Sequence, residues 1–457
     1  MSALWTSIDI AAATGGVARA AFEATGVAFD SREVGPGDLF IALSGEATDG
    51  HKFLDGAFAK GAAGALVSVP TEHPHILVED TTAALNALGI ASRARSSAKI
   101  VGVTGSVGKT GTKEALAAAL ARGNLGPVHR SVKSYNNHTG VPLSLSRMPA
   151  DTRFGVFEMG MNHAGELSAL TQLVRPHVAL VTTIASAHRE FFASDEAIAD
   201  AKGEIFEGLE AGGTAIIPFD SVHRDRLIAA AKPYAANIVT FGLGAGADVR
   251  ALDVVEVVGG TMVTATLPGA DLCFTVSQPG AHWVSNALGV IAAVQAVGGD
   301  LAAAGLALAD FGGLAGRGAQ HRIAAAGGEA LLIDESYNAN PTSMAATLAV
   351  LGATEAKRRV VILGEMRELG PDGPALHAGL STAVQAAGVG FALLVGTAMA
   401  PLAVALDGKI ECVHVPDTAA ALDLLRQEIR AGDALLIKGS NAVGLSRLVD
   451  ALTDGGQ

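Results

Sequence analysis

The chain has 457 residues, roughly two to four times the usual size of one domain, and 49% of them are hydrophobic against 17% charged, which excludes an intrinsically disordered protein. Lys and Arg total 32 against 45 Asp and Glu, a net charge of −13, so surface charge argues against broad binding to nucleic acid or anionic membranes but not against a small anionic substrate. Two cysteines, Cys273 and Cys412, cannot build a disulfide framework and favour a reducing compartment.

The first unit, residues 1–97, alternates strand-like segments with Ala-rich helical segments, and strands are predicted at Asp38–Leu43, Ala65–Val69 and Ile76–Val78. Its segment Asp30–Phe53 is dense in turn formers and polar residues. A polar loop of that length in a compact domain is often functional, and an ordinary surface loop is the alternative.

The second unit, residues 98–308, opens with the predicted strand Ile100–Val103, a glycine-rich turn and the predicted helix Thr110–Ala121. Further strands are predicted at Phe154–Phe157, Val178–Thr182 and Thr214–Ile217. Strands that alternate with helices indicate a mostly parallel sheet with right-handed crossovers.

The third unit, residues 309–457, repeats this alternation. Its predicted strands and helices are Ala330–Ile333, Val360–Leu363, Ala392–Val395, Ala434–Ile437, Pro374–Ala387 and Leu445–Leu452. The fold class predicted for the whole chain is therefore α/β, with a small N-terminal domain, a central parallel-sheet domain and a C-terminal Rossmann-like domain.

Two long stretches without Asp, Glu, Lys or Arg raise the question of membrane spans: Cys273–Gly299 and Gly373–Leu406. Polar residues and glycines interrupt both, so neither is a clean run of about 20 apolar residues, and buried helices and strands are the better interpretation. No Lys or Arg precedes Arg19, so the basic region of a signal peptide is missing. We expect a cytosolic protein without a membrane span.

The strongest chemical signal lies in the turn between the first strand and helix of the second unit. Its residues are Thr104, Gly105, Ser106, Val107, Gly108, Lys109 and Thr110. Glycines let backbone N–H groups close around phosphate oxygens at a helix N-terminus, while the lysine reaches the phosphates and the threonine hydroxyl can bind Mg²⁺. The common motif has Gly where Val103 stands, so this is a shortened variant.

Two further residues follow predicted strands of the same unit. Glu158 ends the strand Phe154–Phe157, at the edge where α/β sheets bind ligands, and could hold Mg²⁺. His188 follows the strand Val178–Thr182 and is a plausible neighbour of that metal. Taken alone, Glu158 is more often a capping or surface carboxylate, and a lone histidine such as His188 is more often structural.

Lys202 lies in a predicted helix, Ser194–Leu209, with Ser194 as its N-cap. Helical spacing places Lys202 on the same apolar face as Ile198 and Ile205. A lysine on a buried face must be paired, neutralised or modified, unless its long side chain reaches the surface.

In the third unit, Arg317 lies between two glycines, where backbone approaches closely, and could pair with phosphate. Asp334 and Glu335 end a strand and precede the polar turn Tyr337–Pro341. Either piece alone could be a structural turn.

These blocks together resemble the Mur ligases, the ATP-dependent amide ligases of peptidoglycan precursor synthesis. In chain order the blocks are TGSVGKT, NNHTGVP, FEMGMN, SAHREFF, AKGEIF, PGAHWVSNAL, GRGAQHR, DESYNANP and LGEMRELG. The resemblance covers nearly the whole chain. The last two blocks resemble the branch that adds D-alanyl-D-alanine to UDP-N-acetylmuramoyl-tripeptide, and DSREVGPGDLFIALSGEATDGHKF resembles the nucleotide-sugar domain of that branch and of the ligase adding the third residue.

The resemblance implies ATP and Mg²⁺ as cofactors, an acyl-phosphate intermediate and a monomer. It assigns phosphate and metal binding to Lys109 and Thr110, and metal binding to Glu158, His188 and a carbamylated Lys202. The other implied contacts are Asn286 to adenine, Arg317 to the γ-phosphate, Asp334 to ribose, Ser31 and Arg32 to the uridine nucleotide, and Asn136 and Asn137 to the peptide substrate.

Four positions depart from the family's pattern: Thr183, Ala185, Pro218 and Asn441. The first two could reshape the loop that carries His188. Two alternatives stay open: a sister ligase that adds a single amino acid, and a non-catalytic nucleotide-binding homologue. The residue types kept at Lys109, Glu158 and Lys202 argue against the second alternative.

Overall fold

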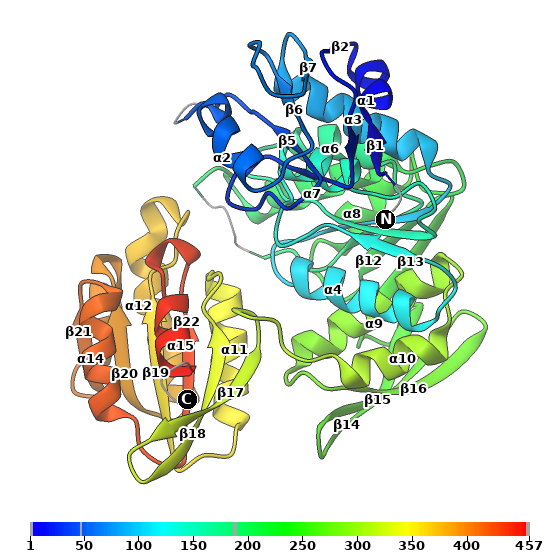
Figure 1. Cartoon of the computed structure of the whole chain (residues 1–457). Helices are drawn as coiled ribbons and strands as arrows, with labels where there is room; N and C mark the ends of the chain where they lie inside the picture. Colours follow the sequence, from blue (N-terminus) through cyan, green and yellow to red (C-terminus); the bar gives the residue numbers. More distant parts are fainter. Residues whose placement is uncertain (1–2, 46–47, 186–189, 454–457) are drawn as a thin grey trace.

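The structure is a computed structural model that describes residues 3–45, 48–185 and 190–453. Its strands form three large sheets, within residues 17–77, 99–276 and 319–438, and one small two-stranded sheet (Figure 1). Each large sheet falls inside one of the three units predicted from the sequence. The domain boundaries near residues 97 and 308 remain a prediction.

The first unit is built on a five-stranded sheet whose strand order is β2-β7-β6-β5-β4. Only β2 runs antiparallel to its neighbour. The elements of this unit are β1 Trp5–Thr6, α1 Ser7–Thr14, β2 Val17–Ala18, β3 Glu23–Ala24, β4 Gly26–Ala28, β5 Asp38–Ile41, α2 Leu54–Ala59, β6 Gly64–Val67, β7 His75–Leu77 and α3 Thr81–Arg95.

The polar segment 30–53 is not one continuous loop. Strand β5 lies in its middle, and the side chains of Leu39, Phe40 and Ile41 are fully buried. Burial of this apolar triplet overrides the turn-forming character of the flanking residues. The segment is therefore two shorter connections on either side of a core strand.

The central sheet has nine strands in the order β16-β15-β14-β13-β12-β11-β8-β10-β9. The pairs from β9 to β14 are parallel, whereas β14, β15 and β16 form an antiparallel meander that the sequence analysis did not predict. The strands are β8 Lys99–Thr104, β9 Val128–Arg130, β10 Phe154–Glu158, β11 Val178–Val181, β12 Thr214–Pro218, β13 Asn237–Gly242, β14 Val249–Val257, β15 Gly260–Leu267 and β16 Ala270–Val276.

Helices cover both faces of this sheet and bury two separate apolar clusters. One face packs against α4 Lys109–Arg122, α9 Ala281–Ala296 and α10 Leu301–Asp310. The other packs against α5 Gly140–Ser146, α6 Glu166–Val174, α7 Asp195–Gly203 and α8 Arg224–Ala231. Burial on both faces explains why the strands read as continuous Val, Ile and Leu runs.

The C-terminal sheet has six strands in the order β17-β18-β22-β19-β20-β21, and all its pairs are parallel except β17 with β18. The strands are β17 Ala319–Ala325, β18 Gly328–Glu335, β19 Arg358–Gly364, β20 Val389–Val395, β21 Glu411–Val415 and β22 Asp433–Lys438. One face packs against α11 Pro341–Ala353, α12 Gly373–Ala386 and α13 Ala400–Leu406, and the other against α14 Thr418–Glu428 and α15 Ser446–Thr453.

The α/β prediction is confirmed. The two uncharged stretches are occupied by the end of β16 with α9, and by α12, β20 and α13. Among the residues that the structure describes, no helix is both long enough and apolar enough to cross a membrane.

Candidate active site

The glycine-rich turn connects β8 to α4 as predicted, and the backbone conformation at both of its glycines requires glycine. Gly105 and Gly108 have φ values of 146° and 87°, which side-chain-bearing residues rarely adopt. A Cβ atom on Gly105 would lie 2.0 Å from Oγ1 of Thr182, and one on Gly108 would lie 2.9 Å from Nδ2 of Asn286. The loop therefore packs directly against the end of β11 and against α9.

The connection after β11 holds this loop through three hydrogen bonds, each of which uses at least one backbone atom. The amide of Ser106 donates to the carbonyl of Thr183 (2.7 Å), and the Ser106 hydroxyl accepts from the amide of Ala185 (3.1 Å). Thr182 donates through Oγ1 to the carbonyl of Val107 (2.6 Å). Because Thr183 and Ala185 contribute backbone groups here, their departure from the family's residue types leaves these bonds intact. His188 lies outside the described residues.

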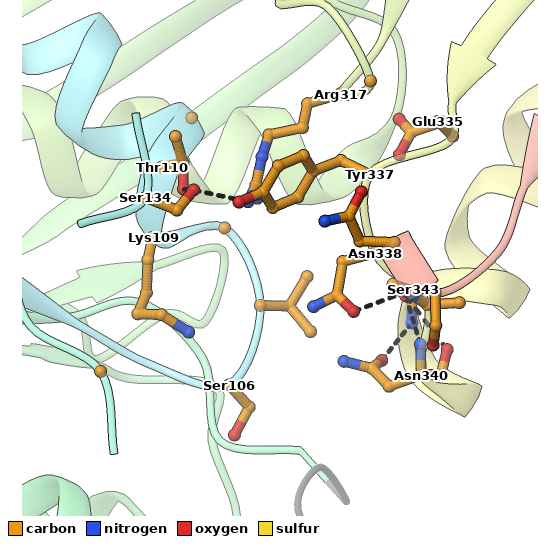
Figure 2. A pocket seen from close by; sticks show the side chains of 18 of the residues that line it. Ser106, Lys109, Thr110, Ser134, Arg317, Glu335, Tyr337, Asn338, Asn340 and Ser343 are labelled. Atoms are coloured by element: carbon orange, nitrogen blue, oxygen red, sulfur yellow. Dashed lines mark hydrogen bonds between the residues drawn. The ribbon is translucent and has the colours of Figure 1, made fainter. Parts of the chain in front are cut away.

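A cavity of about 450 Å³ opens between the glycine-rich loop and the C-terminal unit. Figure 2 shows Ser106, Lys109 and Thr110 on one side and Tyr337, Asn338 and Asn340 on the other. The register of the parallel strands brings the residues of the first side together. Glu158 pairs with Val103 and Val181 with Thr104, so β8, β10 and β11 end at the same edge of the sheet. Ligands bind α/β sheets at such an edge.

The Glu158 carboxylate, which is 1% exposed, faces the Thr110 hydroxyl. Its Oε2 accepts from Oγ1 of Thr110 (2.8 Å), and its Oε1 accepts from Nδ2 of Asn136 (2.7 Å). A hydroxyl and one carboxylate, completed by phosphate oxygens and waters, form the kind of set that binds Mg²⁺. The donor set therefore fits this ion, although the described residues contain no group of three or more His, Cys, Asp or Glu suited to a metal.

Two cationic side chains approach the cavity from different units. Lys109 donates through Nζ to the carbonyl of Gly105 (2.7 Å), and burial lowers its pKa, opposed by the negative charge of Glu158. Arg317 donates through Nη2 to Oγ of Ser134 (3.2 Å), and its guanidinium carbon lies 4.2 Å from the centre of the Tyr337 ring. The hydrogen bond from Arg317 to Ser134 thus joins the two walls, whose labelled residues Figure 2 shows.

Asp334 shapes the loop that carries Arg317. The buried carboxylate accepts from the amides of Gly316 (2.5 Å) and Ser336 (3.1 Å), and the Asp334 carbonyl accepts from the amide of Gly318 (2.8 Å). It is Glu335, not Asp334, that lines the cavity. The ribose contact of Asp334 therefore remains a prediction.

Lys202 lies on the buried face of its helix, as its helical spacing predicts. Helix α7 is capped by Ser194, which accepts from the amide of Ala197, and the Lys202 side chain is fully buried. Its Nζ has no hydrogen-bond partner among the described residues. Burial, aided by the charge of Lys109, holds the pKa of Lys202 well below its usual value. Burial therefore favours the uncharged amine over the ammonium form.

Sequence comparisons place these features in a family. Residues 23–124 match the Mur ligase family catalytic domain, residues 103–294 the Mur ligase middle domain, and residues 321–441 the Mur ligase glutamate ligase domain. The UDP-N-acetylmuramoyl-tripeptide–D-alanyl-D-alanine ligase of Escherichia coli K12 is 36% identical over 94% of each chain. The chain belongs to the Mur ligase family.

Other members of the family match nearly the whole chain, in sequence and in structure. The ligase of the same name from Rickettsia prowazekii is 32% identical over 98% of this chain and 99% of its own. A crystal structure of MurF from Acinetobacter baumannii, 30% identical, matches with a TM-score of 0.85 over 98% of this chain and 99% of that one. MurF from Thermotoga maritima in complex with ADP, 25% identical, matches with a TM-score of 0.77 over 94% and 97%.

The residues assigned to the nucleotide sugar lie away from the cavity of this Mur ligase. The Arg32 side chain is 87% exposed and pairs with Asp30 (2.7 Å), which lowers the pKa of Asp30 to about 2. Lys60 donates to the carbonyls of Ser31 and Arg32 (3.0 Å each). Asn137 accepts from the amide of Gly140 and so helps to start α5, whereas Asn136 lines the cavity.

Several cavity residues of the Mur ligase were not predicted. They are Ser134, His282, Arg367, Glu368 and Lys438. Lys438 ends the predicted strand Ala434–Ile437 and pairs with Glu335 (3.3 Å), so the rule applied to Glu158 could have found it. Burial, with the charge of Lys438, lowers the pKa of His282 to about 4, so this ring is neutral near pH 7. Asn286 and Asn441 also line the cavity.

Proposed function

We propose that this Mur ligase joins D-alanyl-D-alanine to UDP-N-acetylmuramoyl-tripeptide with ATP, which gives the pentapeptide precursor of peptidoglycan. The observation that carries the proposal is similarity along the whole chain to ligases of that name, at 36% identity with the Escherichia coli enzyme. A cavity with a phosphate-type loop on one wall and Arg317 on the other supports it.

In the proposed reaction, a terminal carboxylate oxygen of the tripeptide attacks the γ-phosphorus of ATP, and ADP leaves. The amine of D-alanyl-D-alanine then attacks the acyl carbon, and a tetrahedral intermediate expels phosphate and leaves an amide. Transfer of this kind depends on positioning and on neutralising phosphate charge more than on a protein nucleophile. Lys109 and the backbone N–H groups of residues 107–110 serve the phosphates, whereas the N–H of Ser106 is bound to Thr183. Arg317 serves the γ-phosphate.

Thr110 and Glu158 would hold Mg²⁺, and the half-buried Asn136 amide orients the Glu158 carboxylate toward Thr110. When bound, Mg²⁺ supplies positive charge that offsets the negative charge of the phosphates. We assign His188 to the same metal group on the family pattern alone. Asn286, which lies against Gly108, is assigned to adenine, Asp334 to ribose, and Ser31, Arg32, Asn136 and Asn137 to the nucleotide-sugar peptide.

Lys202 is buried and its Nζ has no hydrogen-bond partner among the described residues, so this amine is suited to carbamylation. Its amine nitrogen can attack the carbon of carbon dioxide, so that an N–C bond forms, one proton leaves to solvent and the side chain becomes an anion. We propose that this anion serves a second Mg²⁺. The depressed pKa of Lys202 supports the step, because only the unprotonated amine reacts. We further propose that the protein acts as a cytoplasmic monomer.

A product assay tests the function. The protein is mixed with ATP, Mg²⁺ and UDP-N-acetylmuramoyl-tripeptide, offered D-alanyl-D-alanine or single amino acids, and the product mass is read. We expect a gain that matches the dipeptide, with phosphate released only when the dipeptide is present. A gain with a single amino acid would move the protein to a sister ligase, and no product despite ATP binding would favour the non-catalytic alternative. Diaminopimelate- and lysine-containing tripeptides, tested separately, identify the third residue.

A further inference from the structure

The segment Ser131–Asn137 links the first unit to the nucleotide cavity. Lys133 forms an ion pair with Glu33, and the Tyr135 hydroxyl donates to Oε1 of Glu33 (2.8 Å). Ser134 and Asn136, which alternate with these two residues, face the cavity instead. Ser134 contacts Thr110 and Arg317, and Asn136 contacts Glu158. One short segment thus presents alternate side chains to two parts of the molecule.

A fully buried lysine of helix α4, Lys113, binds the backbone of this segment. It lies on α4 one turn after Thr110, so both side chains leave the same helix face. Its Nζ donates to the carbonyls of Ser131 (2.9 Å) and Lys133 (2.6 Å). The same Nζ lies 2.9 Å from Oε1 of Glu114 and 4.0 Å from Oε2 of Glu158.

The backbone of the segment requires such support. Lys133 has a φ of 53°, in the left-handed region that residues with a Cβ rarely adopt. Strain of this kind persists only where surrounding contacts hold it. Here Lys113 holds the Lys133 carbonyl, and Glu33 holds its side chain.

We propose that Lys113 is a positioning residue for the ligase reaction. By binding the carbonyls of Ser131 and Lys133, it places Asn136 against Glu158 and Ser134 against Thr110, and so orients the groups that would bind metal–nucleotide. The inference rests on the proposed function, because it concerns the same nucleotide site.

Replacing Lys113 has two effects of opposite sign on metal binding. Loss of its hydrogen bonds frees the segment, withdraws Asn136 from Glu158 and weakens the metal site. Loss of its charge removes a cation 4.0 Å from a Glu158 oxygen, which alone would strengthen cation binding. The sign of the measured change therefore distinguishes positioning from simple electrostatics.

The test is calorimetric titration of the full chain with ADP, with and without Mn²⁺ as the metal probe. In the wild type, Mn²⁺ should tighten ADP binding by a measurable factor. In Lys113→Met, which keeps length without charge or donors, we expect that factor to fall at least fivefold. ADP affinity without metal should change less than twofold, because the glycine-rich loop and Lys109 are untouched.

Leu116→Ala is the matched control, since Leu116 is also fully buried on α4 but is apolar. It should lower the melting temperature and leave the Mn²⁺ factor unchanged. An unchanged or larger Mn²⁺ factor in Lys113→Met would overturn the inference. Should that variant not fold, Lys113→Leu, which also lacks the charge and the donors, is judged by the same criterion. Absence of ADP binding by the wild type would instead contradict the proposed function.

Discussion

At the scale of single residues, the site contains charged groups whose burial serves chemistry more than stability. Lys202 is the clearest case, because its amine is fully buried and unpaired among the described residues. Such a group destabilises the folded state unless it is modified or bound. Arg317 differs, since a guanidinium between Ser134 and the Tyr337 ring is already oriented toward the cavity.

Lys202→Met should stabilise the protein while it abolishes ligase activity. We expect the free energy of unfolding to rise by about 1–3 kcal/mol at pH 7 in buffer free of carbon dioxide, because a buried unsatisfied group is removed. Urea unfolding measures this change. Equal stability of the two proteins, or full activity of the variant, would contradict the assignment.

The same substitution should flatten the dependence of stability on pH. The pKa of Lys202 is lower in the folded than in the unfolded protein, so the unfolded state binds more protons between those two values. The free energy of unfolding therefore rises with pH across that interval, toward about 10.4, and is smallest below the folded pKa. Urea unfolding of wild type and Lys202→Met at several pH values checks whether the wild-type slope exceeds that of the variant.

Arg317→Lys should lower kcat about 100-fold and leave ADP affinity nearly unchanged. Lysine keeps the charge but loses the planar fork that pairs with a phosphoryl group, and the loss falls on the γ-phosphate, which ADP lacks. Steady-state kinetics and ADP titration measure the two quantities. Arg322→Lys, at an exposed position on β17, is the control. A matching loss of ADP affinity would place Arg317 elsewhere on the nucleotide.

At the scale of elements, the phosphate-type loop depends on close contact between β8, the end of β11 and α9. Three hydrogen bonds fix the loop to the connection after β11. Two glycines allow the loop backbone to lie close to Thr182 and Asn286. The loop is therefore preorganised by its neighbours and not by its own sequence alone.

Gly105→Ala should disrupt this contact. The new methyl group would meet Oγ1 of Thr182 at 2.0 Å, at a backbone φ of 146°. We expect a loss of about 2–4 kcal/mol in the free energy of unfolding and loss of ADP binding, from overpacking added to backbone strain. Gly165→Ala tests strain alone, because Gly165 has a φ of 87° and no atom within 4 Å of the added Cβ. Equal losses in both variants would exclude the packing contribution.

At the scale of the whole molecule, the cavity wall is shared between the central and C-terminal units, and the segment Ser131–Asn137 adds a link to the first unit. Arg317 and the Ser134 hydroxyl bridge the cavity, and the carbonyl of Glu368 accepts from the amide of Glu190 (3.2 Å). Domains joined across a ligand cavity commonly change their separation when ligands bind.

We expect the molecule to become more compact when ATP analogue and nucleotide-sugar peptide bind together. In the proposed assignments each ligand would contact more than one unit, so it favours the arrangement in which those units approach. Small-angle scattering measures the radius of gyration with neither, one or both ligands. An identical profile in all three states would contradict closure.

The features that lie within one element or one turn can be predicted from the amino-acid sequence. The glycine-rich loop with Lys109 and Thr110, the carboxylate of Glu158 at a strand end, and Lys202 on an apolar helix face all follow from local spacing. The alternation of strands and helices likewise predicts the α/β layers, and motif order predicts the family. These inferences need only the period of the chain and the chemistry of neighbouring residues.

Which distant segments of the chain meet is known only from the folded structure. Ser134, His282, Glu335 and Lys438 come from four separate parts of the chain, and no local pattern marks them as one cavity. The contacts of Asp334 are likewise tertiary, because its carboxylate accepts from backbone amides that folding brings to it. Local periodicity specifies which face of an element is buried, whereas strand order and the packing of units specify what that face meets.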